Sequence, residues 1–163
     1  MPRLQIASLR PTPFVQQLRR AALVAAALVV PALAQAQLRV IVNRSYPDTD
    51  VSMRDLTRLF RGEYGSLANG QRAVLAEQAT ARARYVRTVT GMDDDTFRRH
   101  WIRIVFAGAP VAPPRGFPDA ETACAFVART PGALAIVEGR CGDDVKTLTV
   151  NGRQGGDAQY PLR

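Results

Sequence analysis

The chain has 163 residues, with 22 basic and 14 acidic side chains, which give a formal net charge of +8 at pH 7. Arginine supplies nearly all of the positive charge and is spread along the chain rather than gathered in one block. This pattern argues against a nucleic-acid-binding protein, in which basic residues concentrate on one face or one element.

Residues 1–36 have the layout of a secretory signal peptide. Four arginines and no acidic residue precede the apolar run AALVAAALVVPAL at 21–33, which is shorter than the roughly 20 residues needed to cross a bilayer. Residues 34–36 read Ala-Gln-Ala, the small-x-small pattern of a cleavage site. We expect cleavage before Gln37, no membrane span in the mature chain, a periplasmic protein and a formal charge reduced to +4. An uncleaved membrane anchor is the alternative.

The first part of the mature chain predicts strands alternating with helices. LRVIVN (38–43) is apolar and β-branched, which is typical of a buried strand. VSMRDLTRLFRG (51–62) predicts a helix, because Ser52 suits the N-cap and the apolar residues after it share one face. QRAVLAE (71–77) predicts a second strand, and TARARYVRTVTG (80–91) predicts a second helix that ends at its glycine.

Three successive aspartates, residues 93–95, begin the third predicted helix. Carboxylates at this position complement the positive N-terminal end of the helix dipole. A calcium loop would instead place its ligands at alternate positions, with a glycine and a later glutamate. The helix should carry a core-facing stripe of Phe97, Trp101, Ile104 and Val105. We therefore predict a capped structural helix and no metal site.

The last part of the chain predicts one more helix and two strands. A Pro/Gly-rich connection at 107–119 leads into a helix at 120–129, for which Asp119 suits the N-cap. ALAIV (133–137) predicts a buried strand, and VKTLTV (145–150) predicts a half-exposed edge strand. Residues 153–163 are polar, and we expect a tail outside the fold.

The order of these elements mixes strands with crossover helices. It predicts an α/β protein of three layers, in which a small mixed sheet is flanked by helices. The length of the mature chain suits a single domain over residues 37–152.

Cys124 and Cys141 are the only cysteines in the chain. In an exported protein, a pair of cysteines most simply forms one disulfide, and their spacing does not suit a CxxC redox pair. The single histidine, His100, has no serine, cysteine or carboxylate at a suggestive spacing. We therefore expect neither an enzyme nor a cofactor.

Several segments, taken in order, resemble one lobe of the phosphate-binding periplasmic receptors of ABC transporters. These segments together cover residues 38–138: the strand VIVN, the helix DLTRLFRG, the turn NG, the helix with a tryptophan and FAG, and VARTPGALAIV. The residues that match the family pattern are Leu56, Leu59, Phe60, Gly62, Thr130, Pro131, Gly132, Ala133, Ile136 and Val137, and Ala135 stands where the pattern favours glycine. The resemblance implies a periplasmic-binding-protein-like lobe. The family clamps phosphate between two such lobes, whereas this chain has length for one.

The resemblance also places an oxyanion site at the N-terminus of helix 80–91. The family's phosphate contact, of the type D-G-S-G-T, aligns with residues 77–81, where the hydroxyl of Thr80 is kept and the glycine is absent. Free backbone N–H groups favour an anion at such a position, and arginine binds phosphate through two parallel hydrogen bonds. The expected ligand residues are Thr80, Ala81, Arg82 and Arg84. The expected ligand is phosphate or another oxyanion, bound weakly because the half-site is open.

The alternative function is that of a structural or interaction protein of the cell envelope that binds no ligand. A lobe that packs against a sister lobe has a face that a homodimer or a complex with an envelope protein can reuse. The loop 107–118 and the polar tail are the candidate contacts.

Overall fold

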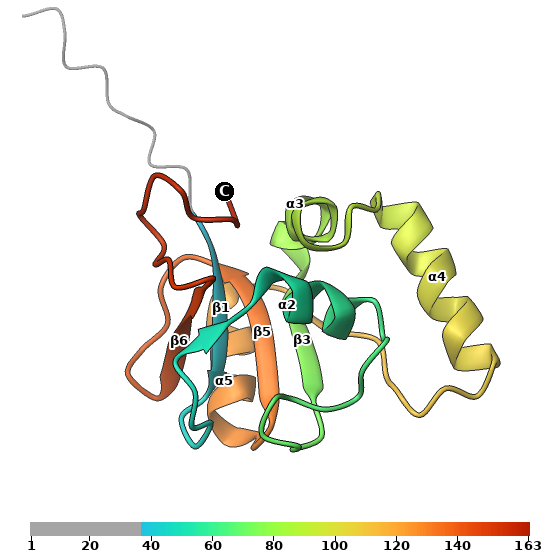
Figure 1. Ribbon diagram of the computed structural model, residues 1–163, viewed down its shortest axis with the longest axis horizontal. Coiled ribbons are helices and arrows are strands. Elements are labelled where there is room, and N and C mark those ends of the chain that lie inside the picture. Colours follow the sequence, from blue (N-terminus) through green and yellow to red (C-terminus); the bar gives the residue numbers. More distant parts are fainter. Residues whose placement is uncertain (1–36) are drawn as a thin grey trace, which may run out of the picture. The chain divides into compact units, whose positions relative to one another are not determined.

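The computed structural model describes residues 37–163, so the predicted signal peptide, with its cleavage motif, lies outside the described residues. A six-stranded sheet has helices on both of its faces (Figure 1). The strands are β1 (Leu38–Asn43), β2 (Asp50–Val51), β3 (Val74–Gln78), β4 (Arg115–Phe117), β5 (Ala133–Glu138) and β6 (Val145–Val150). The helices are α2 (Met53–Phe60), α3 (Arg82–Tyr85), α4 (Asp94–Phe106) and α5 (Ala120–Arg129), with a 3-10 turn at Ala79–Ala81 and a π-helix at Val86–Thr90.

The sheet has the strand order β2-β6-β1-β5-β3-β4. β1 pairs antiparallel with both β5 and β6, while all the other neighbouring strands pair in parallel. The mixed sheet and the three-layer α/β class are therefore as predicted. The prediction that β6 is an edge strand was wrong, because the two-residue strand β2 pairs along its outer side. The sequence analysis did not foresee β2 or β4.

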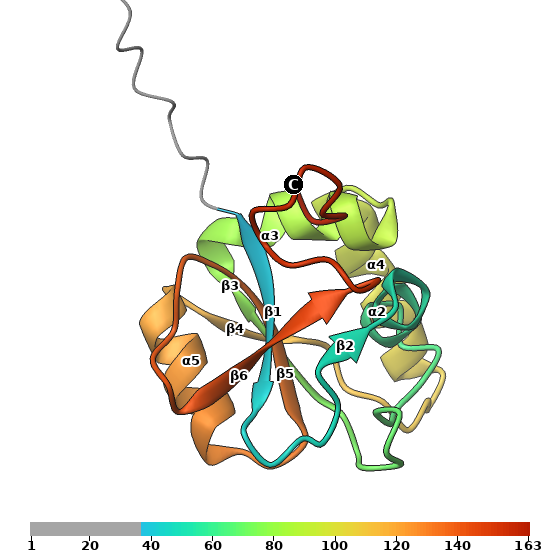
Figure 2. The same cartoon turned by 60° about the vertical axis from the view of Figure 1, so that its left-hand side comes forward.

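The core has two parts, one on each face of the sheet. Successive side chains of β1 alternate, so Val40 and Val42 belong to the larger cluster and Ile41 to the smaller one. The larger cluster packs against α2, α4 and the helical segment 79–90, and the smaller one packs against α5. Figure 2 shows α5 on one side of the sheet and α2 and α4 on the other.

The predicted helix caps are confirmed. Ser52, Asp93 and Asp119 each accept a hydrogen bond from the backbone N–H three residues later, at 2.7 to 3.0 Å. These side chains satisfy N–H groups that have no partner inside the helix. The predicted core stripe of α4 is confirmed for Phe97 and Trp101, but Val105 is 45% exposed.

The end of the chain belongs to the fold rather than forming a tail outside it. Tyr160 is 3% exposed and Leu162 is fully buried, and both pack in the larger core cluster. These two apolar side chains stand among polar residues in the sequence, which is why composition alone suggested a free tail.

Cys124 and Cys141 form the predicted disulfide, with their Cα atoms 5.8 Å apart. The bond joins α5 to the loop that precedes β6 and suits an oxidising compartment. Between residues 37 and 163, no helix is both long and apolar enough to cross a membrane.

Two glycines with nearly the same backbone conformation allow a matched test of the packing at the start of β5. Gly132 has φ +78° and Gly70 has φ +79°, so alanine is strained at both. A Cβ at Gly132 would also stand 2.5 Å from the carbonyl oxygen of Arg72, whereas a Cβ at Gly70 would meet nothing within 4 Å. We expect Gly70→Ala to lower the free energy of unfolding by about 1 kcal/mol and Gly132→Ala to lower it by about 3 kcal/mol, as measured by urea denaturation. Equal losses would contradict the close packing.

Candidate functional site

Charged and polar side chains gather where β3 and β5 end and the helical segment 79–90 begins. We call this region the polar edge and define it by Glu77, Gln78, Thr80, Arg82, Arg84, Asp94 and Glu138. In open α/β sheets, ligands bind outside the carboxyl ends of parallel strands. Figure 1 shows α3 at this end of the sheet, away from the loop between α2 and β3. The polar edge therefore lies where a ligand site is expected in this class of fold.

Arg82 occupies the middle of the polar edge. Its Nε donates to Asp94 Oδ1 at 2.5 Å, and its Nη1 donates to Glu77 Oε1. The guanidinium carbon lies 5.5 Å from the centre of the Phe97 ring, in cation–π range. One side chain thus ties β3 to the first turns of α4. The hydrogen bond and charge of Arg82 also lower the pKa of the Asp94 carboxyl.

Glu77 is a carboxyl group buried at the end of β3. Its side chain is 1% exposed, and its Oε2 atom is buried without a hydrogen-bond partner. Burial raises its pKa from the ordinary 4.5 to about 7, although the charge and hydrogen bond of Arg82 oppose that rise. Glu77 therefore exchanges its proton near neutral pH, and its charge decides how firmly Arg82 is held.

Thr80 does not cap the helix in the way the sequence suggested. The helical segment starts one residue earlier, as a 3-10 turn whose N-cap residue, Gln78, makes no side-chain capping bond. Gln78 Nε2 instead donates to Thr80 Oγ1 at 2.7 Å, and Gln78 Oε1 accepts from the backbone N–H of Glu138 at 2.8 Å. Thr80 is exposed, whereas the side chain of Ala81 is 1% exposed and packs in the core. The side chain of Ala81 therefore cannot contact a ligand at the surface.

The structure places Thr80, Arg82 and Arg84 on the same edge, but both arginines are engaged by carboxylates. Arg84 Nη1 donates to Glu138 Oε1 at 2.9 Å, and both side chains are partly exposed. The sequence analysis missed the acidic side of the site, namely Glu77, Asp94 and Glu138. The sequence did contain a signal for a buried charge, because the carboxylate of Glu77 lies within the largely apolar strand 74–78. Among residues 37–163, no three His, Cys, Asp or Glu side chains are grouped closely enough to hold a metal ion.

Neither a family model nor a curated protein matches this sequence. Solved structures do share its fold. An ABC-type phosphate transport receptor from Vibrio cholerae superposes with a TM-score of 0.55 at 16% sequence identity, over 72% of this chain and 47% of the receptor. PstS from Borrelia burgdorferi superposes with a TM-score of 0.51 at 10% identity, over 73% of this chain and 49% of that protein.

These similarities establish the fold of the described residues. The chain spans about half the length of the receptors that it matches. The predicted resemblance to one lobe of a phosphate-receptor fold is therefore confirmed. Identities of 10 to 16% carry no residue-level assignment, so the ligand and the site residues have to be argued from the polar edge itself.

The buried carboxyl group of Glu77 predicts an unusual dependence of stability on pH. Its folded pKa lies above its ordinary value, so its contribution is fully present below about pH 4.5 and is lost as the pH rises through about 7. We expect the free energy of unfolding to fall between pH 5 and pH 8, and we expect Glu77→Gln to remove most of that fall. Urea denaturation at several pH values measures both. Glu138→Gln, at a partly exposed carboxylate on the same edge, is the control and should leave the slope unchanged. The same slope in Glu77→Gln as in the wild type would show that Glu77 does not titrate in this range.

Proposed function

We propose that this chain is an exported substrate-binding-like module whose polar edge binds an inorganic oxyanion weakly. Phosphate and sulfate are the ligands that this chemistry suits. The proposal is supported by the position of the edge, by the backbone N–H groups at the start of segment 79–90, and by two arginines beside them. The first N–H groups of a helical segment have no partner within it and point outward, so they can donate to an anion.

The charges of the polar edge explain why binding should be weak. Two guanidinium groups, Arg82 and Arg84, face three carboxyl groups, Glu77, Asp94 and Glu138. When all three carboxyls are ionised, they outnumber the arginines, and an anion has to displace one of them from its ion pair. An open site also leaves the anion largely hydrated, so we expect dissociation constants of roughly millimolar to high micromolar.

The protonation of Glu77 carries the proposal, because it makes the anion affinity depend on pH. As the pH falls through about 7, Glu77 gains a proton and Arg82 loses an ionic partner. The charge of the edge then rises by one unit, and the Nη1 donor of Arg82 can turn to an oxyanion while its Nε stays bonded to Asp94. Affinity for an anion of constant charge should therefore increase from pH 8 to pH 6.

Sulfate is the ligand for the test, because its charge does not change in this range. We expect sulfate to shift the backbone amide NMR signals of Thr80 and Ala81, with an affinity roughly tenfold higher at pH 6 than at pH 8. Glu77→Gln should bind at pH 8 as the wild type binds at pH 6 and should lose the pH dependence. No shift at these amides in 50 mM sulfate at pH 6 would end the proposal.

A matched pair of arginine variants separates a site from general charge attraction. Arg84→Gln removes a guanidinium from the polar edge, while Arg129→Gln removes an exposed one from the end of α5. Only Arg84→Gln should weaken sulfate binding. Equal losses in both variants would indicate non-specific attraction to a basic protein.

A second candidate function, protein association, is favoured by the exposed apolar face of α4. Ile102, Val105 and Phe106 are 51%, 45% and 87% exposed, and with Pro113 and Pro114 they border a groove of about 300 Å³. Apolar side chains so exposed commonly mark a contact with another protein. The groove reaches Arg82, so it adjoins the polar edge, and it includes part of the loop predicted as a contact. Because the chain spans half of the matched receptors, the occupant we propose is a second copy of the chain.

Light scattering of the purified protein over a range of concentrations tests this second candidate. We expect a dimer that dissociates on dilution, and we expect the pair Ile102→Ser and Phe106→Ser to shift it to the monomer, because both remove apolar surface from the contact. Glu121→Ser, on the exposed side of α5, should leave the mass unchanged. A wild-type protein that stays monomeric at millimolar concentration would exclude this contact.

A further inference from the structure

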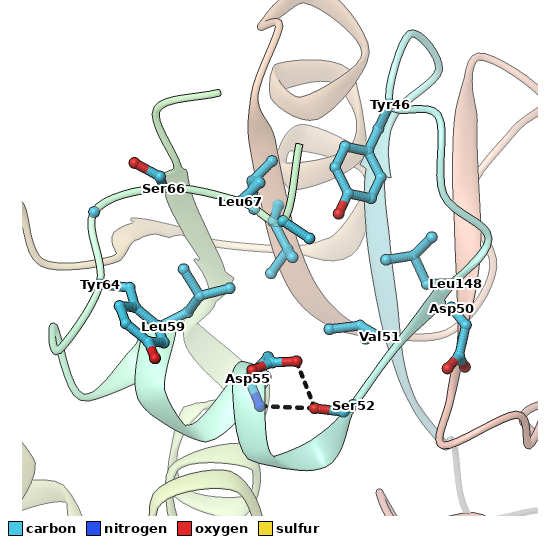
Figure 3. A pocket seen from close by; sticks show the side chains of 13 residues that line it. Tyr46, Asp50, Val51, Ser52, Asp55, Leu59, Tyr64, Ser66, Leu67 and Leu148 are labelled. Atoms are coloured by element: carbon cyan, nitrogen blue, oxygen red, sulfur yellow. Dashed lines mark hydrogen bonds between the residues drawn. The ribbon is translucent and has the colours of Figure 1, made fainter. Parts of the chain in front are cut away.

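A second hollow lies on the face of the sheet covered by α2, and it is separate from the polar edge. We call it the α2 pocket; it measures about 410 Å³, within the range of small-molecule sites. Figure 3 shows it between α2, β2 and the loop that follows α2. Leu134, on its floor, lies near the start of β5, whereas Glu138 of the polar edge lies at the end of that strand. No residue that lines the pocket belongs to the polar edge.

The floor of the α2 pocket is apolar. It is formed by four leucine side chains from four different segments, which are all at most 5% exposed: Leu59, Leu67, Leu134 and Leu148. A hydrocarbon chain or an aromatic ring placed on these side chains would be removed from water, at about 25 cal/mol per Å² of apolar surface. The pocket can therefore hold the apolar body of a small ligand.

The polar groups around this floor are mostly hydrogen-bond acceptors. Asp55 extends its carboxylate from the first turn of α2 beside the hollow, where Oδ2 accepts from the Ser52 hydroxyl at 2.7 Å (Figure 3). An ionised carboxylate has further lone pairs, so this bond leaves Asp55 able to accept from a ligand. The hydroxyl of Tyr46 also points into the hollow (Figure 3). Burial and the neighbouring Asp48 raise the pKa of Tyr46 to about 12, so that the hydroxyl stays protonated.

The charge around the pocket is negative. The charged residues that line it are Asp50 and Asp55, and no arginine, lysine or histidine lines it. Two cations that contact lining residues are engaged by other groups. Arg58 lies 3.7 Å over the ring of Tyr64 and pairs with Glu63, and Lys146 donates to the backbone carbonyls that follow β1. An anionic ligand would be repelled here, which also excludes the pocket as a phosphate site.

We propose that the α2 pocket binds a small amphipathic amine, with its apolar body on the four leucines and its ammonium group hydrogen-bonded to Asp55. An ammonium group has three donors and no acceptor, which complements the carboxylate of Asp55. Its bond to the Asp55 carboxylate is charge-assisted and so stronger than a bond between neutral groups. A neutral ligand of the same shape would desolvate Asp55 without compensating its charge. The pocket should therefore select by charge as well as by shape.

Phenethylamine serves as the probe, with phenethyl alcohol and phenylpropionate as neutral and anionic counterparts of similar shape. We expect the amine to shift the NMR signals of the four leucine methyl groups and to bind about tenfold more tightly than the alcohol. Phenylpropionate should not bind. An alcohol that binds as tightly as the amine, or an amine that moves none of these signals at 20 mM, would overturn the proposal.

Two matched pairs of variants locate the site without unfolding the protein. Asp55→Asn keeps an oxygen that can accept from Ser52 but removes the charge, so amine affinity should fall about tenfold, while Asp143→Asn, at an exposed carboxylate outside the pocket, should change nothing. Ala68→Phe places a ring at the mouth of the pocket and should abolish binding, whereas Ala158→Phe, at an exposed position elsewhere, should not. Unchanged affinity in Asp55→Asn or Ala68→Phe would refute the α2 pocket as the amine site.

Discussion

The guanidinium group of Arg82 joins the end of β3 to the start of α4. It contacts the carboxyl of Glu77 at the end of β3, the carboxyl of Asp94 at the start of α4 and the ring of Phe97. Since Glu77 is buried, an uncompensated charge there would be costly, and Arg82 is the group that offsets it. The position of the 79–90 segment over the sheet and the weakness of any anion site follow from this arrangement, because the arginine best placed for a ligand is already bound.

The sequence predicted the elements whose signals are local and missed those that depend on distant partners. The caps at Ser52, Asp93 and Asp119 act within three residues, and they were read correctly. Strands β2 and β4 have two and three residues, too few to show any periodicity. At the polar edge the helical start and its arginines were predicted, but the ion pairs that restrain them join residues up to 54 positions apart. Such pairings exist only once the topology is known.

The similarity to phosphate receptors is one of fold, and the chemistry of the polar edge differs from what the fold alone would suggest. A fold specifies where strands end and helices begin, and so where a ligand can approach. The side chains at that place decide what can bind. Here a buried carboxyl with a pKa of about 7 stands beside the arginines, so the charge of the site varies within the ordinary pH range. The proposed anion site would therefore bind more tightly at low pH than at high pH.

The α2 pocket and the polar edge share no residue, yet α2 links the pocket to the helical segment that begins at the polar edge. Thr57 Oγ1 donates to the carbonyl oxygen of Val89 at 2.7 Å, and Arg61 Nη2 donates to that of Thr90 at 2.5 Å. Both carbonyls belong to the π-helical end of the segment that begins at the polar edge, where the wider turn leaves backbone groups available to outside donors. Asp55 and Leu59 line the pocket from the same helix, so a ligand in the pocket would contact α2, which is hydrogen-bonded to the segment 79–90. The two sites are therefore joined by contacts through α2. The charge is negative at the pocket and nearly balanced at the edge, so the two sites suit ligands of different kinds.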